Sequence, residues 1–187
     1  MEATSSEQTL CFEETLSIIR KVRDFASSVD IPISPSSRIA QFETQLRRFG
    51  NMKIGDLFKS GVFDWEQFTE GNRDTAELAF ICDTLAERFP LELKKWLRLI
   101  LGGTRLPSQD SDTRSRDKQF ELYVASLFAH SGFSISLDEP DVTFEHRAGW
   151  FGIAAKRISS LEQIEKRVRQ ARKIGRASCR ERVCVPV

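Results

Sequence analysis

The sequence predicts an α+β protein, with an all-helical N-terminal domain followed by a smaller α/β domain. Three observations predict this organisation. Apolar residues recur at helical spacing through most of the first hundred residues, and they alternate with polar residues from Phe133 to Leu137. Between these regions, residues 104–115 are polar, rich in Ser and Asp, and without an apolar period. We therefore predict a helical domain over residues 1–103, a linker over residues 104–115 and the α/β domain over residues 116–172.

Prolines and glycines divide the helical domain into segments. Apolar spacing predicts helices over residues 7–29 and 37–49, the first stopped by prolines and the second by a glycine. Two short amphipathic pieces, residues 54–59 and 63–69, follow and are interpreted as single turns or short helices. Nothing in this half resembles an internal repeat or a glycine-rich nucleotide-binding loop.

The last two helices of this half are predicted from capping residues. Gly71 is interpreted as a break, after which Asp74 caps a helix that runs through Phe89. Pro90 then opens another helix that runs through Leu101, because proline fits the first helical turn.

The C-terminal domain begins with a helix near Ser115 or Arg116. Its predicted buried stripe consists of Phe120, Tyr123, Val124 and Leu127. A half-buried strand over residues 133–137, a hairpin over residues 139–156 and a helix over residues 161–173 follow it.

The hairpin is predicted to place a carboxylate beside a lysine. With its turn at Ala148-Gly149, an antiparallel two-residue hairpin pairs Asp141 directly with Lys156, so that both lie on one face. A slip of one residue would exchange the two faces. The other face carries a small apolar set suited to packing under a helix: Val142, Phe144, Ile153 and Ala155.

This arrangement resembles the active-site hairpin of the PD-(D/E)xK nuclease superfamily, the restriction-endonuclease-like fold, over about residues 116–172. The pattern of that family is a strand with Pro-Asp, a turn and a strand ending in acid-x-Lys, preceded by a helix that often carries a Glu. Pro140-Asp141 matches the first half and Lys156 the terminal lysine, while Glu121 is the candidate helix carboxylate. Ala154 stands where the second carboxylate of the family should be.

The resemblance implies metal-dependent cleavage of DNA, with Mg²⁺ as cofactor. Asp141 and Glu121 would be the metal ligands, and Lys156 would orient the attacking water and stabilise charge. Ala154 weakens such a site, although Mg²⁺ can bind through one or two carboxylates with water and phosphate oxygens. Substitute acids are predicted by proximity in sequence alone: Glu139, Glu145, Glu162 and Glu165.

The helix over residues 161–173 combines a predicted capping box, Ser160 with Gln163, and a basic surface. Its predicted buried stripe is Leu161, Ile164, Val168 and Ala171. The candidate phosphate-binding residues are Arg157, Lys166, Arg167 and Arg169. The alternative is a solvated face held by Glu-Lys and Glu-Arg pairs at four-residue spacing. The resemblance implies a further strand after this helix, so the domain is interpreted as truncated.

Residues 173–183, KIGRASCRERV, resemble the translation of a sequencing adapter, and we interpret residues 173–187 as an artefact. Without residues 174–187, which carry three Arg and one Glu, the formal net charge of +1 falls to about −1. Nucleic-acid binding therefore requires a local basic patch rather than a basic chain.

Cysteine usage and hydropathy predict a cytoplasmic protein without a membrane span. Outside the adapter-like tail only Cys11 and Cys82 remain, which make neither a disulfide framework nor a zinc motif. No apolar run approaches the length of a membrane helix, and the N-terminus lacks the pattern of a secretory signal.

Three functional hypotheses follow. The first is a metal-dependent endonuclease acting on DNA through Asp141, Lys156 and Glu121. The second is a catalytically inactive relic of that fold that binds nucleic acid or protein, which Ala154 favours. In the third, Asp141 only caps a turn, Lys156 is a solvated strand-end lysine, and the protein is a helical interaction scaffold.

Overall fold

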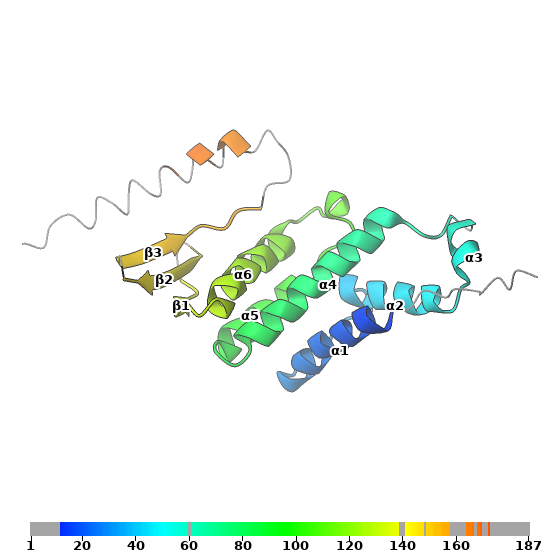
Figure 1. The fold of residues 1–187 in the computed structure, drawn as a ribbon, viewed down its shortest axis with the longest axis horizontal. Helices are drawn as coiled ribbons and strands as arrows, with labels where there is room; N and C mark the ends of the chain where they lie inside the picture. The colour runs from blue at the N-terminus through cyan, green and yellow to red at the C-terminus, as the bar shows by residue number, and fades with distance from the viewer. Residues whose placement is uncertain are drawn as a thin grey trace, which may run out of the picture. The chain divides into compact units, whose positions relative to one another are not determined.

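The computed structural model describes residues 12–59, 61–138, 141–147, 149–157, 164–166, 168–169 and 172. It divides into two compact units, Met1–Gly132 and Phe133–Val187. The first unit is helical and the second contains a small antiparallel sheet, so the predicted α+β class with a helical N-terminal region is confirmed (Figure 1). Of the helices in the described residues, none is long and apolar enough to cross a membrane.

The helices of the first unit follow the predicted order, with two differences described below. Their bounds are α1 Glu13–Ser28, α2 Arg38–Gly50, α3 Ile54–Lys59, α4 Trp65–Leu85, α5 Pro90–Ile100 and α6 Arg114–His130, with a 3₁₀ turn at Pro107–Gln109. The predicted helix over residues 7–29 is confirmed from residue 13 to residue 28, and residues 1–11 lie outside the described part. Ser37 caps α2 by accepting a hydrogen bond from the backbone N–H of Ala40, and Pro90 opens α5 as predicted.

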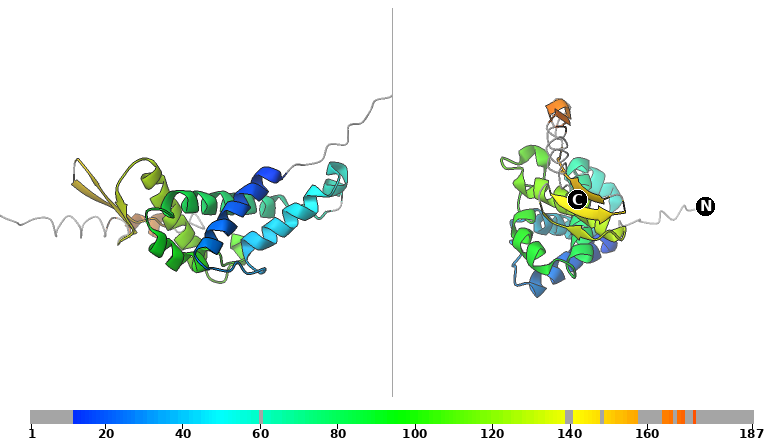
Figure 2. Two further views of the ribbon diagram at one scale, coloured as in Figure 1. Left: turned by 90° about the horizontal axis from the view of Figure 1, so that it is seen from below. Right: turned by 90° about the vertical axis from the view of Figure 1, so that its left-hand side faces the viewer.

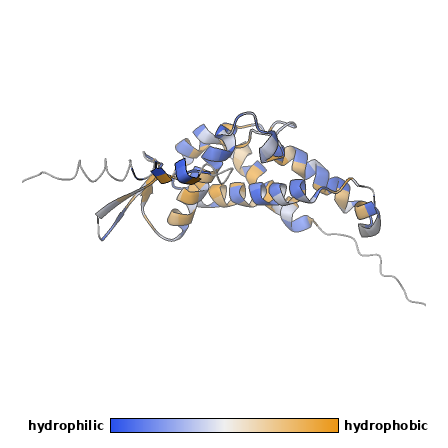
Figure 3. Ribbon diagram, turned by 90° about the horizontal axis from the view of Figure 1, so that it is seen from above, coloured by the Kyte–Doolittle hydropathy of each residue, from blue (hydrophilic) through white to orange (hydrophobic). Residues whose placement is uncertain are grey.

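Helix α4 is the centre of the first unit. It packs against α1, α2, α5 and α6, and α5 also packs against α6 (Figures 1 and 2). Hydrophobic and hydrophilic residues alternate around these helices (Figure 3), which is the amphipathic pattern that buries one face. The largest fully buried apolar side chains are Phe49, Ile19, Leu46, Leu57, Leu78, Ile81, Leu85, Leu93, Leu97, Ile100 and Val22.

The predicted break at Gly71 and cap at Asp74 are wrong, because α4 runs through both residues. Its N-cap is Asp64, whose Oδ1 accepts a hydrogen bond of 3.1 Å from the backbone N–H of Gln67. Gly71 is present for packing: a Cβ there would lie 2.4 Å from a ring carbon of Phe42 on α2. A glycine inside a helix costs about 1 kcal/mol relative to alanine. The close approach of the Phe42 ring explains why glycine stands here.

The buried face of α6 also differs from prediction. Phe120, Tyr123 and Val124 are only partly buried, and Leu127 is 43% exposed. The residues that α6 buries are instead mostly small or polar: Ser115, Arg116, Gln119, Leu122, Ala125, Ser126 and Ala129. The prediction failed because it ranked faces by hydropathy, whereas this face is buried around a polar network.

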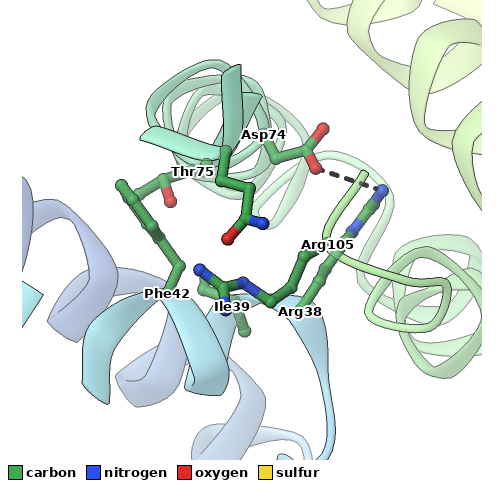
Figure 4. Close-up of a pocket in the computed structure, with 8 residues that line it drawn as sticks. Arg38, Ile39, Phe42, Asp74, Thr75 and Arg105 are labelled. Carbon is green, nitrogen blue, oxygen red and sulfur yellow. Dashed lines mark ion pairs between the residues drawn. The ribbon is translucent and has the colours of Figure 1, made fainter. Parts of the chain in front are cut away.

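That network joins α2, α4 and α6 through two arginines and two carboxylates. Arg116 Nη1 lies 2.6 Å from Asp74 Oδ2, and Arg116 Nε lies 2.6 Å from Asp110 Oδ2. Arg38 Nη1 lies 3.4 Å from the same Asp74 Oδ2 (Figure 4), and Arg38 Nη2 donates to the carbonyl oxygen of Ile100 at 2.7 Å. The side chains of both arginines are 2% exposed. Burial lowers the pKa of Arg38 to about 10, an effect that the carboxylate of Asp74 opposes.

The same network fixes residues 104–115, which the sequence predicted to be a linker. Asp110 Oδ1 accepts hydrogen bonds from the backbone N–H of Thr104 at 2.6 Å and from its hydroxyl at 2.8 Å. Burial acts to raise the pKa of Asp110, but these bonds and the ion pair with Arg116 outweigh it and leave the pKa below its ordinary value. The chain divides after Gly132, because α6 packs with the preceding helices.

The second unit contains a three-stranded antiparallel sheet in the order β1-β2-β3. Its strands are β1 Ile135–Ser136, β2 Val142–His146 and β3 Gly149–Ile153. The β2 and β3 partners are Val142 with Ile153, Thr143 with Gly152, Phe144 with Phe151, Glu145 with Trp150 and His146 with Gly149.

The β2–β3 register differs from prediction by two residues. The last observed pair is His146 with Gly149, whereas the predicted turn would make Arg147 with Trp150 the last pair. Gly149, which closes the loop, has a φ of 122°, a conformation that favours glycine. Because side chains alternate with a period of two, a shift of two residues leaves both predicted faces intact.

Candidate functional site: a carboxylate and lysine at the end of the hairpin

Asp141 and Lys156 lie side by side at the open end of the β2–β3 hairpin. Lys156 Nζ lies 3.2 Å from Asp141 Oδ2. The backbone N–H of Ala155 donates a hydrogen bond of 2.9 Å to the same oxygen. The predicted proximity of the carboxylate and the lysine is confirmed. The chemical role of the pair stays a prediction.

The strands position this pair through the alternation of side chains. Val142 and Phe144 on β2 are buried, as is Ala155 beyond β3. Phe144 stacks on Phe151, with the ring centroids 5.4 Å apart, and contacts Phe133 at 4.9 Å. Asp141 directly precedes Val142, so the apolar contacts of this face orient the neighbouring carboxylate.

The observed register changes which residue is directly opposite Asp141. The ladder ends with Val142 opposite Ile153, and continuing it by one residue puts Asp141 opposite Ala154. Lys156 therefore reaches the carboxylate from two positions further along the chain, on the same face. The side chain of Asp141 is 11% exposed and that of Lys156 is 45% exposed. The carboxylate is thus held inside while the ammonium group meets solvent.

Glu121 lies in α6, in the first unit, with Lys118 as a partner. Lys118 Nζ lies 2.8 Å from Glu121 Oε2 and 4.3 Å from the centroid of the Trp96 ring. The two side chains are 22% and 17% exposed, so Glu121 belongs to a partly buried ion pair of the helical unit. Its role as a second metal ligand stays a prediction.

Two of the four candidate substitute acids, Glu145 and Glu165, lie in the described residues. Glu145 shares a strand face with Asp141 but lies four residues along β2, or about 13 Å at the usual rise of a strand. Glu165 is exposed and pairs with Arg169 at 2.6 Å. Glu139 and Glu162 lie outside the described residues.

The candidate phosphate-binding residues are only partly described. Lys166 and Arg169 are exposed and Arg157 is half-buried, whereas Arg167, Ser160, Gln163, Leu161, Ala171 and residues 173–187 lie outside the described part. Ile164 and Val168 are 41% and 60% exposed, so their predicted burial is wrong. Amphipathic spacing shows which residues share a face, but not whether another element covers that face.

The residues of the hairpin fit a divalent ion only through a small donor set. No group of three or more His, Cys, Asp or Glu side chains that could hold a metal occurs within the described residues. Asp141 supplies a hard oxygen ligand, which Mg²⁺ accepts when water and phosphate oxygens complete its shell. Asp141 is thus a single hard ligand, and Mg²⁺ binding at the hairpin stays a prediction.

Sequence reasoning missed the backbone N–H of Ala155 as a partner of Asp141. Backbone donors have no residue signature, and only the strand register would have indicated this one.

No family model matches this chain, and neither a curated protein nor a solved structure matches it. Functional conclusions therefore depend on the geometry of the hairpin and on the residue pattern.

Proposed function

We propose that the hairpin of the second unit is the active site of a cytoplasmic, metal-dependent nuclease that cleaves phosphodiester bonds in DNA. The observation that carries the proposal is the 3.2 Å contact between Lys156 Nζ and Asp141 Oδ2. A nearly buried carboxylate can hold a divalent ion, and the half-exposed ammonium group beside it can stabilise negative charge on a phosphate.

Each residue of the hairpin has one role in this proposal. Asp141 would hold Mg²⁺, which when bound polarises a phosphate oxygen and neutralises developing charge. The backbone N–H of Ala155 fixes the orientation of the carboxylate. Lys156 orients the attacking water and stabilises negative charge on the phosphate. The exposed Lys166 and Arg169, with Arg157 and Arg167, would bind the DNA backbone without reading sequence.

A second candidate is a relic of the nuclease fold that binds nucleic acid without cleaving it. Ala154 favours it, because the position directly opposite Asp141 has no side-chain oxygen. A relic would retain DNA in a salt-sensitive way but leave it intact in every metal.

Replacing Ala154 by Glu tests the function and separates the two candidates. The new carboxylate would lie opposite Asp141, where two carboxylates are close enough to share one ion. We expect the wild-type chain to nick circular DNA in Mg²⁺ or Mn²⁺ but not in EDTA. Ala154→Glu should lower the Mg²⁺ concentration for half-maximal nicking by about tenfold, a size typical of changes around a metal site.

Ala154→Gln is the matched control, because it has a similar size without the charge. Nicking by Ala154→Glu alone would identify the wild-type chain as the relic. If neither the wild-type chain nor the Ala154→Glu variant nicks DNA in any metal, the nuclease proposal is wrong.

A further inference from the structure

The first unit contains a cavity of about 440 Å³ that is separate from the hairpin. It lies between α2, the beginning of α4 and the loop after α5. Ligand pockets commonly have volumes of about 300–1,000 Å³. The cavity is therefore large enough for a small organic molecule.

The charged side chains lining this cavity are both arginines. Arg48 comes from the last turn of α2 and Arg105 from the loop after α5. None of the described residues that line it is acidic. Arg105 also donates a hydrogen bond from Nη2 to Gln45 Oε1, which holds one end of the guanidinium group against α2. Arginine forks fit phosphate oxygens in a bidentate manner.

A second, smaller cavity adjoins the first, since Gln67 and Arg105 line both. It has about 10 Å³ of space and is shown in Figure 4, where Arg105 extends into the region between α2 and α4. Arg38 lines it with a buried side chain whose Nε and Nη1 make no hydrogen bond to the described residues. The charges of Arg38 and Arg116 are balanced by Asp74 and Asp110, so Arg48 and Arg105 give the larger cavity its positive charge.

The remaining lining residues add hydrogen-bonding groups and an apolar surface. Gln41, Gln45 and Gln67 carry side-chain amides with donor and acceptor groups. Gln41 Nε2 donates to the carbonyl oxygen of Ser36, and Gln45 Oε1 accepts from Arg105, so these two amides would meet a ligand through their other groups. Phe49 and Val62 supply apolar contact. A ligand that matches this lining carries an anionic group, further hydrogen-bonding groups and an apolar surface such as the face of a ring.

We propose that this cavity binds a small phosphate monoester with a hydrogen-bonding ring, of the mononucleotide class, through Arg48 and Arg105. The inference concerns the helical unit and does not rest on nuclease activity at the hairpin. The two arginines would hold the phosphate, and the glutamine amides would bind the ring.

The test is titration calorimetry of the full chain with AMP, GMP, CMP and UMP, beside inorganic phosphate and adenosine as single-part probes. We expect saturable binding of at least one mononucleotide, at least tenfold tighter than binding of either phosphate or adenosine. Arg48→Gln and Arg105→Gln should each weaken binding by about tenfold or more, the size of a lost charge-assisted hydrogen bond.

Arg47→Gln is the matched control, since Arg47 is a 60% exposed neighbour on α2 that pairs with Glu43 and does not line the cavity. It should bind as the wild type does. Arg105→Gln also removes the contact with Gln45 and so acts on the loop itself. Arg48 is exposed, so Arg48→Gln should keep the fold and tests the site separately. Binding of inorganic phosphate as tightly as the mononucleotides, unchanged binding by Arg48→Gln, or no binding at all would overturn the proposal.

Discussion

Replacing Asp74 by Asn is expected to lower the free energy of unfolding by about 3–5 kcal/mol, the cost of breaking a buried ion pair by removing one partner. Asp74 Oδ2 lies 2.6 Å from Arg116 and 3.4 Å from Arg38, and both guanidinium groups are 2% exposed. Without the carboxylate, the two positive charges would face each other inside the unit, with Asp110 and Glu77 as the remaining negative charges that act on Arg38. The measurement is urea unfolding followed by circular dichroism.

The matched control is Asp83→Asn, on the same helix. Asp83 pairs with Lys21 at 3.5 Å, but the two side chains are 55% and 59% exposed. Exposed pairs contribute about 0–1 kcal/mol, so this change should shift the midpoint little. Equal destabilisation by the two substitutions would contradict the assignment of Asp74 as the charge that holds α2 and α6 to α4.

Replacing Asp141 by Asn is expected to reduce DNA cleavage by at least about 100-fold, because changes to the outer partners of a metal ligand already cost about 10–100-fold. Asparagine has nearly the same shape but lacks the charge that would hold Mg²⁺. In the wild type, the charged Oδ2 of Asp141 accepts hydrogen bonds from both the N–H of Ala155 and Lys156 Nζ. The amide of asparagine offers no charged oxygen to these two donors. Cleavage is measured as initial nicking rates at saturating Mg²⁺.

Glu145→Gln is the control for this substitution. Glu145 lies on the same strand face and is exposed at the turn end of β2. It should leave the nicking rate within about twofold of wild type, as surface substitutions have small effects. Matching circular dichroism spectra would show that both variants keep the fold. A rate loss for Glu145→Gln as large as that for Asp141→Asn would move the metal site away from Asp141.

The helices of the first unit were predictable because their apolar residues follow the helical period. The error in α4 arose where tertiary contacts overruled local signals. Gly71 suggested a break, but the Phe42 ring occupies the space that a side chain would need. Asp74 suggested a cap, but two arginines distant in sequence neutralise it. The residues next to Gly71 and Asp74 in the sequence indicate neither the Phe42 ring nor the two arginines.

For the candidate hairpin site, the sequence predicted the two faces but not the turn or the register. The alternation of apolar residues placed Asp141 and Lys156 on one face, and this survives the shift of two residues in register. The turn itself was placed one residue late, because the residues around Gly149 carry no strong hairpin signal. The hydrogen bond from the N–H of Ala155 to Asp141, and the ladder whose extension puts Ala154 opposite Asp141, therefore came only from the structure.

No pattern in the sequence predicts the cavity in the first unit. Arg48 and Arg105 are 57 positions apart, and Gln67 joins them from a third element. The packing of α2 against α4 brings Arg48 and Gln67 together, and the contact of Arg105 with Gln45 adds the loop after α5.

The most direct measurement of the central claim, that Asp141 and Lys156 act as one catalytic unit, is a double-mutant cycle on the nicking rate with Asp141→Asn, Lys156→Met and both together. Residues that act as a unit have strongly non-additive effects. We predict that each single variant loses most of the activity and that the double variant is within about threefold of the slower single variant. Losses that multiply, or a Lys156→Met variant as fast as wild type, would contradict the account.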